Sequence, residues 1–301
     1  MPVIGIDLGG TNLRWAVVAP DGKRLYQERA ARPRQAEAIA AAVREAIDDC
    51  RARHPQVRAV GISVAGVIGE SGIRSINLDW RDFDLRGSIG LDDLPLVIVN
   101  DMAAGAVGEL WAGRARGMSN VVYLTISTGI GAGIIIGGQI YRGRDGMAGE
   151  AGHTVVDLNG LLCSCGRRGC WEMIASGTAH QRRIREAFAS GTWPNLSESP
   201  SPAEVTERAR QGDRAARALV LRTARYIGIG VANLVNLYDP DAIIFTGGFA
   251  RSNWDLIHDY LLDEVRSQAL TDKTQLLLTE LGDDAGLIGA ARQAMLAEQQ
   301  P

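Results

Sequence analysis

The sequence has 301 residues, 46% of them hydrophobic, and a formal net charge of −3. This is the composition of a soluble globular protein with enough apolar side chains for two ordinary cores. Its 32 basic residues are spread along the chain and form no basic stripe, which argues against a nucleic-acid partner. The first residues resemble neither a signal peptide nor a membrane span, so we expect a cytoplasmic protein without a membrane partner.

The chain opens with an apolar strand at residues 3–8, followed by Gly9, Gly10 and Thr11 and then by two further strands. Asp7 lies within this otherwise buried run and needs a cation, because burying an unpaired charge is costly. The glycine amides could approach an anion, as in a phosphate-binding loop, although a plain hairpin fits the local sequence equally well. The motif is not a Rossmann fingerprint, because the glycines precede a strand and not a helix.

An amphipathic helix is predicted at residues 34–50, a buried strand within 57–66 and a glycine-rich loop at 66–72. A strand at 95–99 then brings Asn100 and Asp101 to its carboxyl end, where ligands bind in open α/β sheets. Either residue could instead cap the helix predicted at 102–111. Capping is the commoner reason for such residues at this place.

The opening pattern of strand, Thr/Gly loop, strand and glycine turn returns at residues 121–141, which indicates a duplicated α/β fold. Two facing loops of this kind would hold one nucleotide from both sides. Helices are predicted at 177–190, 203–210, 215–237, 253–268 and 285–298. A strand at 241–246 runs into Gly247 and Gly248, where bare backbone could lie against adenine, although a plain strand-to-helix turn fits as well.

Residues 147–172 contain a cluster of potential zinc ligands: His153, Cys163, Cys165 and Cys170. Three sulfurs and one nitrogen fill a tetrahedral site and leave no position for water, which indicates structural zinc. Gly166 and Gly169 allow the tight turns that this spacing needs. A disulfide or unpartnered buried thiols are the alternative, but clustered cysteines without a secretion signal favour a metal. Cys50 lies outside the cluster and is expected to be a small buried side chain.

Seven motifs together resemble the ROK family of sugar kinases and sugar-responsive repressors, most closely its bacterial glucokinases. They are DLGGTN, NDMAAGAVGE, TISTGIGAG, AGEAGH, CSCGRRGCWE, DPDAIIFTGG and GLIGAA, and they extend over nearly the whole chain. The resemblance implies a duplicated actin-like, hexokinase-like (ribonuclease H-like) α/β fold with two domains, a central cleft and a zinc-binding knuckle. We expect a small domain at residues 1–113, joined by the helix at 285–298, and a larger one at 114–284.

The same resemblance implies that the protein phosphorylates the 6-hydroxyl of a hexose with ATP, with glucose as the first choice. Asp101 corresponds to the general base that takes the proton of the attacking hydroxyl. Its sugar-binding residues would be Asn77, Asn100, Asp101, Glu150, His153 and Glu172. His153 would ligate zinc through one ring nitrogen and face the sugar through the other.

For the nucleotide, the resemblance implies contacts from Asp7, Gly9, Gly10, Thr11, Asn12, Thr128, Gly129, Gly247 and Gly248. Asp7 would hold, through water, the Mg²⁺ that accompanies ATP. Zinc would be the structural metal. A homodimer is expected, since such assemblies are common among soluble enzymes.

The sequence departs from the family pattern at Ser127, Ala132 and Met102, and at residues 65–67, where AGV replaces PGP. The first three changes bear on the affinity for the nucleotide, and the change at residues 65–67 bears on which residues form the floor of the sugar pocket. N-acetylmannosamine, N-acetylglucosamine or a broad range of hexoses would use nearly the same residues as glucose. A sugar-responsive repressor would carry a helix-turn-helix ahead of the nucleotide loop, and six residues precede Asp7, so a kinase is the favoured interpretation.

Overall fold

The computed structural model describes residues 1–76 and 78–299, and the chain divides into two compact units. The first unit takes its described residues from 1–121, 133–148 and 279–301. The second unit takes residues 122–132 and 149–278.

The first unit is built on a five-stranded sheet of order β3-β2-β1-β4-β8. Its strands are β1 (Val3–Leu8), β2 (Asn12–Val18), β3 (Arg24–Ala31), β4 (Val60–Val64) and β8 (Leu96–Asn100). The pairs β1–β2 and β2–β3 are antiparallel, whereas β1–β4 and β4–β8 are parallel.

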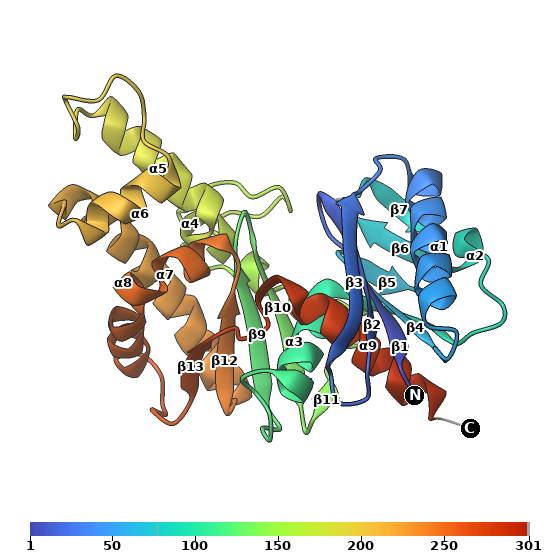
Figure 1. Cartoon of the computed structure of the whole chain (residues 1–301). Helices are drawn as coiled ribbons and strands as arrows, with labels where there is room; N and C mark the ends of the chain where they lie inside the picture. The colour runs from blue at the N-terminus through green and yellow to red at the C-terminus, as the bar shows by residue number, and fades with distance from the viewer. Residues whose placement is uncertain (77, 300–301) are drawn as a thin grey trace. The chain divides into compact units, whose positions relative to one another are not determined.

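Helices α1 (Ala36–Arg53) and α9 (Ala285–Glu298) cover opposite faces of this sheet (Figure 1). Successive side chains of a strand point to opposite faces. On β1, Ile4 and Ile6 therefore pack in the core that contains α1, while Val3 packs in the core that contains α9.

Two glycines let α9 approach the sheet closely. A Cβ atom at Gly61 of β4 would lie 1.9 Å from the carbonyl oxygen of Ala290, and one at Gly5 would lie 2.5 Å from that of Leu287. Since no real side chain tolerates such distances, glycine is required where the strand and the helix backbone meet.

The segment at 66–72, predicted as a glycine-rich loop, is a loop only in part. It contains β5 (Val67–Gly69) and leads into β6 (Gly72–Ser75), and these strands form a small antiparallel sheet with β7 (Trp80–Phe83). Gly66 and Gly72 have φ angles of +147° and +132°. These backbone conformations favour glycine and account for the two residues even though the segment is largely strand. Helices α2 (Leu85–Ile89) and α3 (Asp101–Ala112) belong to the same unit.

A second five-stranded sheet has the order β11-β10-β9-β12-β13. Its strands are β9 (Val121–Ile126), β10 (Ile130–Ile136), β11 (Gln139–Ile140), β12 (Ala242–Thr246) and β13 (Gln275–Leu278). The helices of the second unit are α4 (Trp171–Ala175), α5 (Gly177–Ala189), α6 (Pro202–Arg210), α7 (Arg214–Tyr238) and α8 (Gly248–Arg266).

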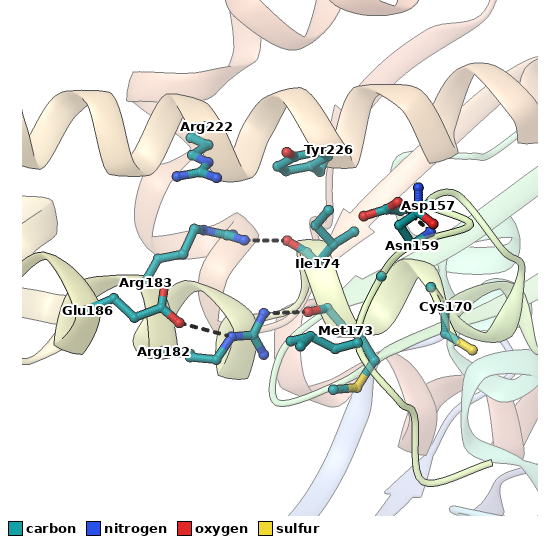
Figure 2. A pocket seen from close by; sticks show the side chains of 13 residues that line it. Asp157, Asn159, Cys170, Met173, Ile174, Arg182, Arg183, Glu186, Arg222 and Tyr226 are labelled. Atoms are coloured by element: carbon teal, nitrogen blue, oxygen red, sulfur yellow. Dashed lines mark hydrogen bonds and ion pairs between the residues drawn. The ribbon is translucent and has the colours of Figure 1, made fainter. Parts of the chain in front are cut away.

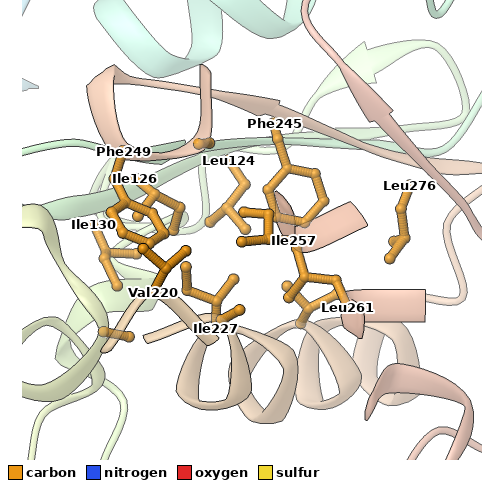
Figure 3. Close-up of a cluster of buried hydrophobic side chains, with 14 of the residues drawn as sticks. Leu124, Ile126, Ile130, Val220, Ile227, Phe245, Phe249, Ile257, Leu261 and Leu276 are labelled. Carbon is orange, nitrogen blue, oxygen red and sulfur yellow. The ribbon is translucent and has the colours of Figure 1, made fainter. Parts of the chain in front are cut away.

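The core of the second unit lies between strands and helices. Figure 3 shows Leu124 of β9 and Phe245 of β12 facing Ile227 of α7 and Ile257 of α8. By length and hydropathy alone α7 could cross a bilayer, but 56% of its most apolar window is buried inside the protein. It has the burial of a core helix.

Candidate active-site residues and metal centre

Asn100 and Asp101 lie where β8 ends and α3 begins, in the first unit. The Asn100 side-chain oxygen accepts hydrogen bonds from the amides of Met102 (3.0 Å) and Ala103 (3.1 Å), so Asn100 is the N-cap of α3. Its side-chain nitrogen donates to the Gly66 carbonyl and to the Asp101 carboxylate, both at 3.1 Å. The capping role is confirmed, and Asn100 also fixes the orientation of the Asp101 carboxylate.

Asp7 is buried on the α9 side of β1, and its cation is Arg14. The two residues are direct partners across β1 and β2, and the Arg14 guanidinium lies 3.0 Å from one Asp7 oxygen. The Ser63 hydroxyl donates to the other oxygen, also at 3.0 Å. Burial raises the pKa of the Asp7 carboxyl, and Arg14 and Ser63 oppose that rise. Each carboxylate oxygen has two lone pairs and here accepts one hydrogen bond, so a contact with Mg²⁺ through water fits this group.

The loop after β1 presents backbone amides. Gly9 donates to the carbonyl of Asn12 at 3.0 Å, and the Arg32 side chain donates to the carbonyl of Gly10. Within the part of the chain that the structure describes, the amides of Gly10 and Thr11 donate no backbone hydrogen bond. Exposed amides of this kind are what a phosphate-binding loop requires.

In the second unit, Glu172 joins the Thr/Gly loop at residues 127–131 to α4. Its carboxylate accepts a hydrogen bond of 2.9 Å from the Ile130 amide, and a Cβ atom at Gly129 would lie 2.3 Å from the same oxygen. The loop is also fixed to α5, because Gly177 donates to the Ser127 carbonyl at 2.7 Å and the Thr178 hydroxyl donates to the Thr128 carbonyl at 2.8 Å.

Gly247 and Gly248 follow β12, and Gly247 lies beside the end of β9, where this loop begins. Gly247 has a φ angle of +87°, and a Cβ atom there would lie 2.6 Å from the carbonyl oxygen of Ile126, the last residue of β9. Gly248 begins α8 and would have open space around a Cβ atom. Thr128, Gly129, Gly247 and Gly248 therefore lie at the ends of two neighbouring strands, β9 and β12. Ala132, one of the departures from the family pattern, has its side chain buried in the core of the second unit.

The four predicted zinc ligands converge. One ligand atom from each of His153, Cys163, Cys165 and Cys170 lies within 4.8 Å of the others. Cys165 and Cys170 have sulfurs 3.5 Å apart, and the Cys163 sulfur lies 3.6 Å from His153 Nδ1. Ligands about 2.3 Å from a tetrahedral zinc stand roughly 3.8 Å apart, so the donor set and spacing fit this ion.

Glycines shape the turns of residues 147–172, the predicted zinc knuckle. Gly166 and Gly169 have φ angles of +85° and +75°, which confirms the turn conformation predicted for them. A Cβ atom at Gly169 would lie 1.6 Å from the carbonyl oxygen of Asp157. Cys50 is fully buried in the core of the first unit, as predicted, and burial raises the pKa of its thiol to about 12.

His153 presents its two ring nitrogens to different groups. Nδ1 is next to the Cys163 sulfur, whereas Nε2 lies 3.7 Å from the Glu150 carboxylate. With zinc on Nδ1, the ring would be held with Nε2 beside Glu150. Both side chains remain partly exposed, at 30% for His153 and 49% for Glu150.

Asn77 lies outside the described residues. Sequence reasoning missed Arg14 and Ser63 as the partners of Asp7, although the hairpin register offered a signal for Arg14 because it places that residue opposite Asp7. It also gave no role to Glu109 of the NDMAAGAVGE motif, which is fully buried. The Glu109 carboxylate accepts hydrogen bonds from the backbone amides of Glu280, Leu281 and Arg114. It therefore has the structural role of satisfying buried backbone donors.

The sequence model of the ROK family matches residues 3–299. The chain is similar to a glucokinase of Streptomyces coelicolor, with 36% identity over 309 aligned positions that cover 96% of both chains. It is also similar to a xylose repressor of Caldicellulosiruptor bescii, with 34% identity over 80% of this chain and 64% of the repressor. Among solved structures, a ROK glucokinase of Streptomyces griseus in complex with glucose and AMPPNP has a TM-score of 0.82 and 36% identity, over 98% of this chain and all of the other.

Proposed function

The chain belongs to the ROK family, and we propose that it transfers the terminal phosphoryl group of ATP to the 6-hydroxyl of glucose. It is an ATP-dependent sugar kinase with the two-domain α/β fold of that family. One observation carries the proposal: Asn100 holds the Asp101 carboxylate at the carboxyl end of β8, in a chain that aligns with glucokinases over 96% of its length.

We assign the general base to Asp101. Phosphoryl transfer depends mainly on positioning and charge neutralisation, with a base aligned on the attacking hydroxyl. Asp101 suits this role because Asn100 restrains one carboxylate oxygen. The proton of the sugar 6-hydroxyl would pass to Asp101 as that oxygen attacks the phosphorus atom.

We assign the sugar contacts to Glu150, His153 and Glu172, with a further contact from Asn77. Paired carboxylate oxygens and a fixed imidazole suit a polyol, since each can form directional hydrogen bonds with ring hydroxyls. Glu172 is held by the Ile130 amide, and His153 would be held by zinc. For Asn100 we propose positioning of Asp101 as the main role, because its donor and acceptor atoms already have partners.

We assign the phosphate contacts to the loop at residues 9–12 and to Thr128 and Gly129, and the adenosine contact to Gly247 and Gly248. Asp7 would hold Mg²⁺ through water, and that ion, when bound, neutralises phosphate charge. The similar glucokinase of Streptomyces griseus was solved in complex with glucose and AMPPNP, which supports the same pair of substrates for this chain.

An assay of ADP release with ATP and Mg²⁺ over a panel of sugars tests the proposal. The panel contains glucose, mannose, fructose, N-acetylmannosamine and N-acetylglucosamine. We expect glucose to have the highest kcat/KM. A higher kcat/KM for either N-acetylhexosamine would contradict the choice of glucose, and equal values for all hexoses would identify a broad hexokinase. We also propose a homodimer, which sedimentation equilibrium would test.

A further inference from the structure

A pocket of about 300 Å³ lies beside the predicted zinc knuckle, and all of its lining residues belong to the second unit. Its walls come from the knuckle, from α4 and α5, and from α7 (Figure 2). Three arginines line it: Arg182 and Arg183 from α5 and Arg222 from α7. This volume is within the usual range for small-molecule sites.

Arg183 is a buried cation, and among the described residues no carboxylate lies within ion-pair distance of its guanidinium. Only 6% of the residue is exposed. Its guanidinium donates to the Ile174 carbonyl at 2.7 Å and to the Thr223 hydroxyl at 2.8 Å, while its Nε is buried and has no partner. Burial and the neighbouring Arg222 and Arg182 lower the pKa of Arg183 to about 10. A buried charge of this kind is costly unless an opposite charge balances it.

The neighbouring arginines differ in their pairing. Arg182 donates to the Met173 carbonyl at 2.7 Å and lies 3.6 Å from the Glu186 carboxylate. In the described ranges 1–76 and 78–299, no carboxylate lies within ion-pair distance of Arg183 or Arg222. Of the three arginines that line the pocket, Arg183 and Arg222 are therefore the two without an ion-pair partner.

The opposite wall is polar and comes from the knuckle. Figure 2 shows Asp157 and Asn159 across the pocket from the arginines, with the Tyr226 ring beside them. Asp157 accepts a hydrogen bond of 3.0 Å from the Asn159 amide, which leaves acceptor positions on its carboxylate. Such groups suit hydroxyls, whereas the arginine side suits a phosphate, whose oxygens match a guanidinium.

We propose that this pocket binds a phosphate group through Arg183 and Arg222. The phosphate is either free inorganic phosphate or the phosphate of a small phosphorylated sugar whose hydroxyls contact Asp157 and Asn159. The ligand balances the charge of Arg183 and bridges α5, α7 and the knuckle. This is a second ligand site in the unit, distinct from the groups at the ends of β9 and β12.

Calorimetric titration of the whole protein tests the site. The titrants are inorganic phosphate and a hexose 6-phosphate, in the presence of saturating glucose and AMPPNP so that sites used in turnover are filled. Arg222→Gln is the main variant, because Arg222 is exposed and its side chain has no hydrogen-bond or ion-pair partner among the described residues. Arg217→Gln, an exposed arginine on the same helix that does not line the pocket, is the control. Arg183→Gln is a second variant, although its loss can also disturb folding.

We expect Arg222→Gln to weaken phosphate binding by roughly tenfold or more, equivalent to about 1.4 kcal/mol, and Arg217→Gln to leave it unchanged. Tighter binding of the hexose 6-phosphate than of phosphate would show that the sugar hydroxyls also contact the pocket, and equal affinities would show that the phosphate alone is recognised. Identical binding by wild type and Arg222→Gln, or no binding by wild type, would overturn the proposal. These readouts do not depend on turnover, so they can fail while the proposed kinase function stands.

Discussion

The side-chain amide of Asn100 donates a hydrogen bond of 3.1 Å to the carboxylate of Asp101, its neighbour in the chain. The same side chain caps α3 and holds the Gly66 carbonyl, so one residue connects a helix terminus, a glycine with a positive φ angle and the proposed base. Substitutions at Asp101 and at Asn100 should therefore have different effects on catalysis and on stability.

Replacing the proposed base should stop chemistry without unfolding the protein. For Asp101→Asn we expect kcat to fall by about 100-fold to 10,000-fold, the usual contribution of a general base, with little change in the dissociation constant of glucose. Steady-state kinetics and calorimetry measure the two quantities. Asp92→Asn, at an exposed position, is the matched control. A kcat near that of wild type would refute the assignment of Asp101.

Asn100 should act on catalysis through Asp101 as well as on stability. Asn100→Ala removes the cap of α3, which costs about 1 kcal/mol, and should also lower kcat. Asn100→Asp keeps a capping acceptor but loses the donor to Asp101. If Asn100 positions the base, kcat stays low in both variants while the melting temperature recovers partly in Asn100→Asp. Recovery of kcat together with the cap would show that the role is only structural.

The zinc knuckle should contain stoichiometric zinc. We expect Cys165→Ser to lose the ion and to melt at a lower temperature, because a metal that binds only the folded state stabilises it. Elemental analysis and circular dichroism measure both effects. Cys50→Ala, at a buried cysteine outside the cluster, should keep the metal. Purified wild-type protein without zinc would contradict the predicted site.

His180 should make the stability of the second unit depend on pH. Burial, and then the Arg183 charge, lower the pKa of His180 from 6.5 to about 4, and its Nε2 is buried without a partner. The folded state therefore keeps His180 neutral, while the unfolded state takes up a proton below pH 6.5. Stability is fully present above that pH and falls towards pH 4, by about 3 kcal/mol at most.

Denaturation of wild type and His180→Gln at pH 7.5 and pH 4.5 measures this effect. The stability difference between the two proteins should shrink at the lower pH, since the variant has no imidazole to protonate. His258→Gln, at a partly exposed histidine, provides the control. A difference that is the same at both pH values would exclude His180 as the source.

A methyl group added where β4 packs against α9 should destabilise the protein. Gly61→Ala would place Cβ 1.9 Å from the Ala290 carbonyl oxygen, and we expect a loss of roughly 2–3 kcal/mol, typical of overpacking. At Gly69 the nearest atom to a Cβ is 3.7 Å away, so Gly69→Ala should change stability by about 0.5 kcal/mol or less. Thermal melts compare the two. Equal melting temperatures would contradict the close approach.

The spacing of hydrophobic residues predicted the long helices and strands well, because burying one face of such an element requires a regular spacing. The strand at 3–8 and the helices at 177–190 and 215–237 agree with β1, α5 and α7 within two residues at each end. The short elements β5, β6, β7 and β13 were missed, since three or four residues carry no clear period. The start of α8 at Gly248 was also missed, because a glycine after a strand is typical of a turn.

The candidate site was predictable where chemistry is local and unpredictable where it depends on packing. The spacing of Cys163, Cys165 and Cys170, with His153 nearby, was enough to predict that these four side chains converge. By contrast, Ser63 reaches Asp7 only because β1 and β4 are adjacent, and Glu172 reaches Ile130 only through the packing of α4. Sequence alone does not specify such pairings between distant segments.

The position of α9 has a consequence for biosynthesis. The strands β1 and β4 precede the second unit in the chain, but the helix that covers one of their faces is translated only after that unit. If the strands pair before α9 is translated, Val3, Ala16 and Ala59 lack the helix that covers them in the folded protein, and such uncovered strands are prone to aggregate. A chaperone that shields them during translation would therefore raise the yield of folded protein.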